Sequence, residues 1–376
     1  MDLRLTEQQE ILKKSARDFL TKECPKAKIR ELEKDEKGYD PALWQKMAEL
    51  GWLGFNITEE YEGMGYSFED LTIHIEEVGK NILPGPYLST VVNTFAIVEA
   101  GSDEMKKDLL PKISNGKCIL TLAWLEDNGQ FDAHGITMKA AARGNDYVLN
   151  GTKYFVDSAH VADKMVVVAR TGGSSGPDGI TLFVVDAKAP GIKSEIIPII
   201  SLDKLCVVTF KDTTVPAKNM LGKVNKGWDI LQTVIRKGSI LKSAESLGGL
   251  ETVVDMTVAY SKERVQYDRQ IGAFQALQHK MSDMWISLST SKYLLYEAAW
   301  MESEGIPNAR EASMAKAYIN EAYKFVTAWG VKLHGGIGTS ADHDVPLYYR
   351  RAKAADTIYG STEYHRERVA QTIGLK

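Results

Sequence analysis

The sequence predicts an α+β protein of three parts: an N-terminal helical domain (residues 1–117), a central antiparallel β-barrel or sandwich (118–226) and a C-terminal four-helix bundle (227–376). Three observations lead to this prediction. Apolar residues recur at helical spacing in the first part. In the middle, short runs rich in Val, Ile, Leu and Phe are bounded by turn residues. In the last part the helical period returns over stretches long enough for a bundle.

The bulk composition excludes several classes of protein. The net charge is −4 and 44% of the residues are hydrophobic. A nucleic-acid-binding protein usually carries a basic excess, so no nucleic-acid partner is expected. No run approaches the roughly 18 apolar residues that span a bilayer, and the charged N-terminus does not resemble a secretory signal. We therefore expect a cytoplasmic protein without a membrane partner.

The three cysteines, Cys24, Cys118 and Cys206, lie far apart and form no C-x-x-C pair. Neither a disulfide framework nor a zinc site is predicted from such spacing. We expect reduced thiols and no bound metal.

The N-terminal part is predicted to be helical. Thr6 is followed three residues later by Gln9, the pattern of a capping box at a helix start. Pro84-Gly85-Pro86 separates two later helices, because proline cannot continue a helix. After the first helix, further ones are expected over residues 43–53, 66–80 and 88–115.

The central part is predicted to be built of strands. Asn150-Gly151 indicates a two-residue hairpin, and residues 171–179 indicate a surface loop. No helical period interrupts the strands, which favours an antiparallel arrangement over a parallel βαβ sheet. Strands are expected over residues 118–125, 147–150, 164–170, 180–186 and 205–210.

The bundle is predicted from four long stretches of helical period. Their lengths suit helices that pack side by side around one core. They cover, roughly, residues 228–262, 273–303, 308–334 and 350–372.

Several short motifs follow one another along essentially the whole chain. They are Leu50-Gly-Trp-Leu-Gly54, Glu59-Glu-Tyr-Glu-Gly-Met-Gly65, Glu76-Glu-Val-Gly79, Pro84-Gly-Pro-Tyr87, Leu149-Asn-Gly-Thr-Lys153, Glu263 to Gly272 with Phe274-Gln275, and Leu333-His-Gly-Gly-Ile-Gly338. Each motif alone is weak. In this order and spacing they resemble the acyl-CoA dehydrogenase family.

The resemblance implies FAD as cofactor, with its flavin between the β domain and the bundle and its adenylate reaching a neighbouring subunit. Arg264 takes the position of a phosphate-binding arginine, for which the planar guanidinium is well suited. Gln275 matches a cofactor-binding glutamine. Gly335 and Gly336 would let the backbone approach the cofactor phosphates closely.

Four further positions are carried over from the family. Phe155 and Asp157 stand where the family has an aromatic residue and a hydroxyl donor against the flavin ring. Thr362 and Tyr364 replace the T-x-Q motif that holds the adenylate. The resemblance also implies an acyl-CoA substrate, an electron-transfer flavoprotein as partner, and a homo-dimer or tetramer, or else a hetero-oligomer with a homologous subunit.

The sequence departs from the family at the strand end that contacts the flavin. Where the family reads TEP-x-A-G-S-D, this chain keeps only Glu126 and Asp132 in register. The serine that contacts the CoA pyrophosphate is missing. Such weakened motifs also occur in subunits that bind FAD poorly inside mixed oligomers.

The second departure concerns the catalytic base. The family usually places a glutamate in Y-E-G-T, but this chain has Gly360, and a second family position maps to Gly238. Gly360 keeps an N–H that could donate to the thioester, and the missing side chain is expected to leave room for a bulkier acyl group.

Glu245 is the replacement that we expect. Residues 241–249 resemble the L-x-A-A-E-x-L-G-G helix of a subgroup that also ends in G-S-x-x-x-HR, as this chain does. Its helical neighbours include Leu241 and Gly248, so the carboxylate would face an apolar surface, as a desolvated base does. The alternative is a helix-face ion pair with Lys242 or Arg236.

Other titratable residues are weaker candidates for the base. The remaining acids are Asp157, Glu126 and Glu363. His334 and His343 flank the glycine loop, where histidine is more often a structural hydrogen-bonder.

Three functions compete at this point. The first is an FAD-dependent dehydrogenase of a CoA thioester with a bulky, cyclic, branched or dicarboxylic acyl group. The second is a related lyase or desulfinase without net oxidation. The third is a non-catalytic subunit of a hetero-oligomeric dehydrogenase.

Overall fold

The computed structural model describes residues 4–173 and 175–375. Contacts between Cα atoms divide the chain into two units. The bundle unit comprises Met1–Arg30, Ser67–Leu83 and Ser239–Lys376. The sheet unit comprises Glu31–Tyr66 and Pro84–Gly238. The three domains with boundaries at 117 and 226 stay a prediction.

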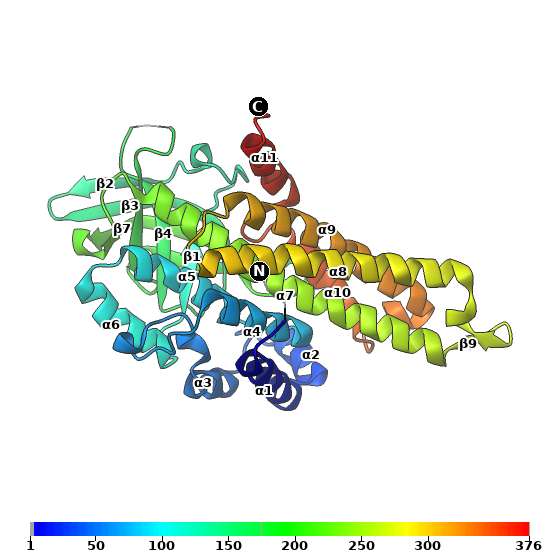
Figure 1. Cartoon of the computed structure of the whole chain (residues 1–376). Coiled ribbons are helices and arrows are strands. Elements are labelled where there is room, and N and C mark those ends of the chain that lie inside the picture. The colour runs from blue at the N-terminus through cyan, green and yellow to red at the C-terminus, as the bar shows by residue number, and fades with distance from the viewer. Residues whose placement is uncertain (1–3, 174, 376) are drawn as a thin grey trace. The chain divides into compact units, whose positions relative to one another are not determined.

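The bundle unit is built of helices, three of them long, and one small hairpin in the described part of the chain (Figure 1). Its helices are α1 (Glu7–Glu23), α2 (Lys26–Lys34), α4 (Phe68–Asn81), α7 (Gly227–Glu263), α8 (Gln275–Ser303), α9 (Ala309–His334), α10 (Val345–Ala355) and α11 (Thr362–Thr372), of which α2 and α7 also extend into the sheet unit. The hairpin joins β9 (Val265–Gln266) to β10 (Arg269–Gln270). The predicted capping box is confirmed, because Thr6 Oγ1 accepts from Gln9 N and Gln9 Oε1 accepts from Thr6 N.

The prediction of one helix over residues 350–372 is wrong. The chain forms α10 and α11 with a turn between them. Tyr359 has φ 58° and Gly360 has φ 109°, conformations that a right-handed helix cannot contain. The turn therefore sets Gly360 off from both helices.

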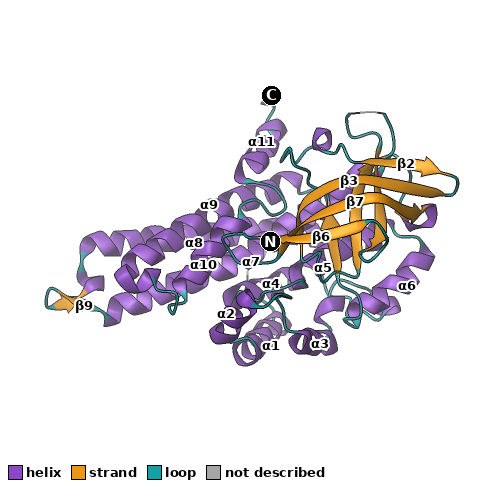
Figure 2. Ribbon diagram, turned by 180° about the vertical axis from the view of Figure 1, so that it is seen from behind, coloured by secondary structure: helices purple, strands orange, loops and turns teal. Residues whose placement is uncertain are grey.

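Besides its parts of α2 and α7, the sheet unit combines three described helices with an eight-stranded sheet (Figure 2). The helices are α3 (Pro41–Glu49), α5 (Tyr87–Ala100) and α6 (Asp103–Ser114). The strands are β1 (Leu120–Ala123), β2 (Lys139–Arg143), β3 (Asp146–Asp157), β4 (Lys164–Arg170), β5 (Ile180–Asp186), β6 (Ile192–Ile197), β7 (Leu205–Pro216) and β8 (Met220–Leu221).

Most strand pairs are antiparallel, as predicted, but the sheet is mixed. Its order is β6-β7-β3-β2-β4-β5-β8, and β1 pairs with β4. The β1–β4 and β2–β4 pairs are parallel. None of the helices in the described part of the chain is long and apolar enough to cross a membrane.

The predicted hairpin at Asn150-Gly151 is wrong, because β3 runs straight through these residues. The β2–β3 turn lies at residues 144–145, where Arg143 pairs with Asp146. Gly151 instead marks a shift in register against β7. A Cβ there would come within 2.8 Å of Met138 Cγ, so the glycine serves close packing rather than a turn.

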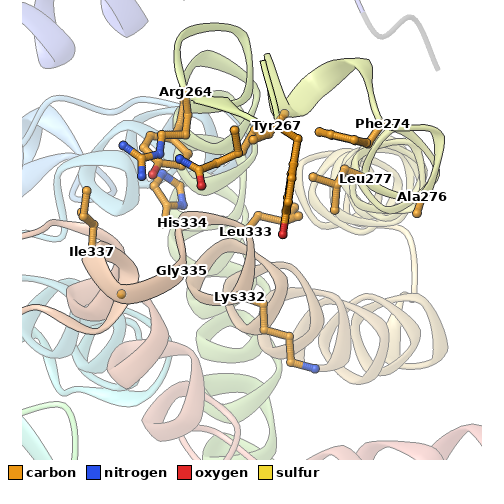
Figure 3. A pocket seen from close by; sticks show the side chains of 14 residues that line it. Arg264, Tyr267, Phe274, Ala276, Leu277, Lys332, Leu333, His334, Gly335 and Ile337 are labelled. Atoms are coloured by element: carbon orange, nitrogen blue, oxygen red, sulfur yellow. The ribbon is translucent and has the colours of Figure 1, made fainter. Parts of the chain in front are cut away.

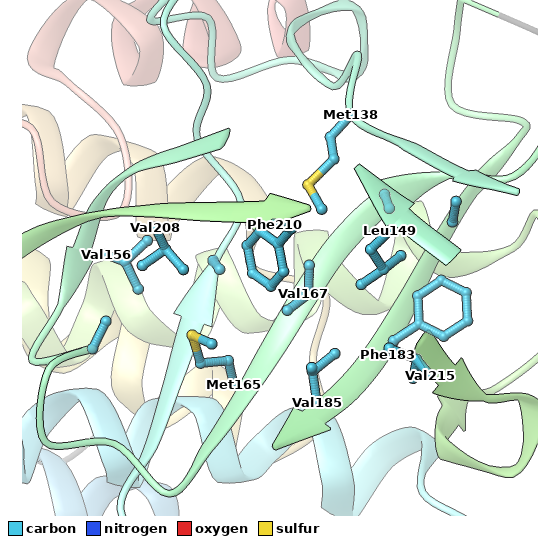
Figure 4. Packing of buried hydrophobic residues seen from close by; sticks show 14 of the residues in the cluster. Met138, Leu149, Val156, Met165, Val167, Phe183, Val185, Val208, Phe210 and Val215 are labelled. Atoms are coloured by element: carbon cyan, nitrogen blue, oxygen red, sulfur yellow. The ribbon is translucent and has the colours of Figure 1, made fainter. Parts of the chain in front are cut away.

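One apolar cluster forms the core of the sheet (Figure 4). Side chains two residues apart along a strand point to the same face, so β4 supplies Met165 and Val167 while β5 supplies Phe183 and Val185. Phe210 of β7 lies in the same cluster. Nearly every residue of β4 and β5 is buried, which explains their uninterrupted apolar sequence.

Candidate cofactor site and active site

A pocket of about 800 Å³ lies at one end of the bundle unit (Figure 3). It is formed where the end of α7, the β9–β10 hairpin, the start of α8 and the end of α9 meet. Arg264 brings a positive charge to it, and none of its fourteen described lining residues is acidic. The Lys332 side chain extends away from the other lining side chains, with its ammonium over the Trp329 ring. Tyr260, Tyr267 and Phe274 add aromatic rings. Such a lining suits a planar ring system joined to phosphate.

The hairpin fixes the backbone beside Arg264. Tyr267 and Asp268 both have positive φ, at 54° and 62°, as the two central residues of a type I′ turn require. The Ile271 N–H donates to the Arg264 carbonyl over 2.9 Å. Arg264 itself is exposed and therefore accessible to a ligand.

The end of α9 supplies the glycine turn that the sequence singled out. Gly335 has φ 63° and ψ −138°, a combination that is essentially restricted to glycine. A Cβ at Gly335 or Gly336 would meet nothing within 4 Å. No protein atom therefore demands a glycine at Gly336, and the open space is available to a bound group. Gln275 begins α8 between two lining residues but does not line the pocket itself.

His334 has a structural role beside this turn. Its Nδ1 lies 2.7 Å from the Gly330 carbonyl, so Nδ1 carries the hydrogen, and its ring stacks on Tyr260 at 4.5 Å. Burial lowers the pKa of His334, and the neighbouring His343 lowers it further. The hydrogen bond and the lowered pKa both agree with a structural role for His334 rather than with proton transfer.

Gly360 lies in the α10–α11 turn, and the room expected beside it is absent. A Cβ on Gly360 would come within 2.5 Å of His365 Nε2 and 2.6 Å of Tyr364 Cδ1. The volume next to the glycine is filled by the two side chains of α11. The expectation that the missing glutamate leaves space for a larger acyl group is therefore wrong along the direction that a side chain at Gly360 would take.

Side chains of α9 hold the start of this turn. Lys316 Nζ donates to the Ala355 carbonyl over 2.8 Å and to Asn320 Oδ1 over 2.6 Å. The amide of Asn320 donates to the Asp356 carbonyl over 3.2 Å. Lys316 is fully buried; burial first, and the nearby Lys242 second, lower its pKa to about 7.

Thr362 and Tyr364 are placed differently from a simple cofactor-binding pair. The Thr362 side chain is fully buried, and its hydroxyl donates to Asp356 Oδ1 over 2.6 Å. The Tyr364 hydroxyl accepts from Arg368 Nη1 over 3.1 Å. Figure 1 shows α11 and β9 at opposite ends of the bundle unit, so one chain does not bring these residues to the pocket of Arg264.

Glu245 forms a helix-face ion pair, which was the alternative to its role as the catalytic base. Its carboxylate pairs with Lys242 and keeps 20% of its side chain exposed. It also lies close enough to Lys316 to raise that lysine's pKa against the effect of burial. The backbone of Glu245 packs directly on α4, where any side chain at Gly79 would collide with the Glu245 carbonyl. The carboxylate is thus held on a closely packed helix crossing.

In the sheet unit, the end of β3 turns an aromatic ring outward. A register shift between Lys153 and Val156 marks a β-bulge, and Phe155 within it has φ 55° and is 53% exposed. An exposed phenylalanine held by strained backbone points to a functional contact. Asp157 accepts a hydrogen bond from Ser158 Oγ over 2.7 Å.

A buried ion pair fixes this strand end. Lys153 Nζ donates to Glu126 Oε1 over 2.8 Å and to the Trp124 carbonyl over 3.1 Å, while Thr137 and Met138 also donate to Glu126. Burial works to raise the pKa of Glu126, but Lys153 and these hydrogen bonds outweigh it and hold the pKa below its usual range. Glu126 is therefore committed to structure rather than to proton transfer.

Sequence reasoning missed Lys316 and Asn320 as residues that support the site, and it included Lys153 only as the last residue of a family motif. A lysine or asparagine on a helix carries no local signal that its head group will be buried. His365 was noticed only as part of a motif, because its partner, the Tyr359 carbonyl, lies in a turn that the helical pattern concealed.

Comparisons with known proteins agree with these features. Three family models match along most of the chain: the acyl-CoA dehydrogenase N-terminal domain over residues 6–117, the middle domain over 121–213 and the C-terminal domain over 225–374. The chain is 32% identical to acryloyl-CoA reductase (NADH) of Anaerotignum propionicum, over 99% of this chain and 96% of that protein. It is also 32% identical to the caffeyl-CoA reductase-Etf complex subunit CarC of Acetobacterium woodii, over 99% of both.

The fold leads to the same family. The structure of butyryl-CoA dehydrogenase from Megasphaera elsdenii superposes with a TM-score of 0.92 at 29% identity, covering 99% of this chain and 100% of that one. All three parts of the chain, in order, are thus accounted for. The chain belongs to the acyl-CoA dehydrogenase family and is an FAD-dependent oxidoreductase of the class that acts on CH–CH bonds.

Proposed function

We propose that this enzyme interconverts a CoA thioester and its α,β-unsaturated form, exchanging electrons with an electron-transfer flavoprotein. The observation that supports it most is the pocket at the bundle end, where Arg264 and the Gly335-Gly336 turn border space without any acidic side chain. The lining fits the adenosine diphosphate part of FAD: the Arg264 guanidinium would pair with the phosphates, and the aromatic rings would flank the adenosine.

When bound, FAD supplies the acceptor of hydride from the β carbon. The chain's own residues would then bind and orient the reactants. Phe155 would present its exposed ring to the flavin. The Gly360 N–H would donate to the thioester oxygen as negative charge develops there, which is where a fixed donor lowers the barrier.

The cofactor site is proposed to be shared between copies of this chain. Within one chain, α11 lies at the other end of the bundle unit from the pocket. The helix α8, which begins at the pocket, carries the exposed apolar side chains of Trp285, Ile286 and Tyr293, between 57% and 59% exposed. A second copy would cover them in a homo-dimer or tetramer, and sedimentation of the FAD-loaded protein tests this.

Glu245 is proposed as the base that removes the α proton. It is placed on a close helix crossing, near the same buried Lys316 that holds the Gly360 turn. Its ion pair with Lys242 would have to open for proton transfer. Glu245→Gln should abolish turnover while FAD stays bound, and Glu363→Gln, an exposed acid at the start of α11, should not. Unchanged turnover of Glu245→Gln would refute the assignment.

The identity of the acyl group is a separate part of the proposal. A bulky, branched, cyclic or dicarboxylic group was expected, but its space cannot come from the side-chain direction of Gly360, which His365 and Tyr364 fill. Anaerobic titration of the flavin absorbance with a panel of acyl-CoA thioesters, from butyryl-CoA to cyclic and dicarboxylic ones, tests it directly. Bleaching by short straight chains alone would refute the bulky substrate and leave the reaction class intact.

A second candidate is a non-catalytic subunit of a mixed oligomer. It is favoured by the Glu245–Lys242 ion pair together with the lack of a side chain at Gly360. Purified chain that holds no flavin, and that gains it only with a homologous partner, would support this candidate. Product formed with bound flavin but without an electron acceptor would indicate a lyase instead.

A further inference from the structure

The peptide between Tyr359 and Gly360 is held from one side. His365 Nε2 lies 2.9 Å from the Tyr359 carbonyl oxygen, and because a carbonyl only accepts, Nε2 carries the hydrogen. In a trans peptide the C=O and the following N–H point in opposite directions. Holding the Tyr359 carbonyl against His365 therefore directs the Gly360 N–H away from α11.

The imidazole is itself fixed in place. His365 is 2% exposed, its Nδ1 lies 3.2 Å from Ser313 Oγ on α9, and the Tyr364 ring meets it edge-on at 5.1 Å. Burial, with a contribution from the Lys316 charge, lowers the pKa of His365 to about 3. The ring is thus neutral at working pH and keeps the same tautomer, so the donor at Nε2 is constant.

The Gly360 N–H has no acceptor in the described part of the chain. Gly360 is buried, yet among residues 4–173 and 175–375 no hydrogen-bond acceptor is found for its N–H. Buried backbone N–H groups without a partner are rare in folded proteins. A carbonyl oxygen of a bound ligand would satisfy this group.

We propose that His365 is a positioning residue for catalysis, which aims the Gly360 N–H at the thioester oxygen by holding the Tyr359 carbonyl. This inference rests on the function proposed above. Tyr359, with φ 58°, is in a region that most residues avoid, so the turn needs such an anchor to persist. The donor acts on charge that develops in the transition state, so its loss should lower kcat more than it raises KM.

The test compares two substitutions of His365 in the FAD-loaded enzyme. His365→Leu removes the donor at similar volume, and His365→Gln keeps an N–H that can reach the same carbonyl. Arg366→Leu is the matched control, since Arg366 is the next residue on α11 and forms only an exposed ion pair with Glu321. Turnover is measured with butyryl-CoA, and the carbonyl stretch of bound, carbonyl-13C-labelled crotonyl-CoA is measured by infrared difference spectroscopy.

In His365→Leu, kcat should fall roughly 10- to 100-fold with KM within about twofold, because an aimed backbone donor is lost only in part. The crotonyl carbonyl stretch should return toward its value in water, and His365→Gln should recover much of both. Wild-type kcat and wild-type stretch in His365→Leu would overturn the inference. If that variant does not fold, Ser313→Ala, which frees the ring, should show a smaller fall in kcat at unchanged KM, and no fall would equally overturn it.

The same spectra separate this inference from the proposed function. A wild-type enzyme that binds crotonyl-CoA without any shift of its carbonyl stretch would refute the thioester contact with Gly360 altogether. A shift in the wild type that persists in His365→Leu would leave the function standing and refute only the role of His365.

Discussion

Returning a side chain to position 360 should destabilise the protein rather than activate it. Gly360 has φ 109°, and a Cβ there would collide with the rings of His365 and Tyr364 at 2.5 and 2.6 Å. The backbone conformation alone costs a non-glycine residue on the order of 1–3 kcal/mol. Overpacking against these two rings, of which His365 is buried and hydrogen-bonded at both nitrogens, adds about 1–3 kcal/mol. Gly360→Ala should therefore lower the free energy of unfolding by roughly 2–6 kcal/mol.

A matched substitution separates the two contributions. Gly305, the residue after the C-cap of α8 in the same unit, has φ 67°, but a Cβ there would meet nothing within 4 Å. Gly305→Ala should show only the backbone part of the cost. In urea unfolding followed by helical circular dichroism, the free energy of unfolding of Gly360→Ala should therefore be clearly lower than that of Gly305→Ala. In a His365→Ala background the steric part of the Gly360→Ala cost should shrink, because only the contact with Tyr364 Cδ1 at 2.6 Å would remain.

The same geometry predicts the behaviour of Gly360→Glu. Even though it restores the family's usual residue, the carboxylate would start from a Cβ that has no room, so kcat should not exceed that of the wild type. A folded Gly360→Glu that turns over faster, or a Gly360→Ala as stable as Gly305→Ala, would refute the reasoning.

Three further results are expected. Arg264→Ala should weaken FAD binding to the apoprotein by roughly 10- to 100-fold, since a charged hydrogen bond is worth about 1.5–3 kcal/mol, and fluorescence titration measures it; unchanged affinity would remove Arg264 from the site. Burial lowers the pKa of Lys316 to about 7 from 10.5, so between these pH values the unfolded chain binds more protons and this residue's contribution to stability rises with pH, by on the order of 5 kcal/mol in all. Lys316→Met should flatten that rise in urea unfolding at pH 6, 8 and 10, and parallel curves would contradict it. Burial raises the pKa of the Cys118 and Cys206 thiols to about 12 and 11, so neither should react with a disulfide reagent until the protein is unfolded.

Much of the fold could be read from local pattern. The capping box at Thr6 predicts a helix start, and the apolar run Met165–Ala169 predicts a buried strand. Both predictions succeed because these elements restrict the residue types of a few neighbouring positions. The same rules misled at Asn150-Gly151, where a glycine that packs on Met138 looks like a hairpin turn. They also misled at residues 350–372, where the apolar period continues across a turn.

The sequence by itself determined the family, the order of the parts and the absence of a carboxylate at residues 238 and 360, because these depend on residue identity and motif order. Only the tertiary structure decided what surrounds Gly360. That His365 occupies its side-chain volume and that Lys316 holds the preceding turn are contacts between residues far apart in the chain. Burial of a lysine head group or the direction of one N–H follows from packing in three dimensions, and a local pattern does not record it.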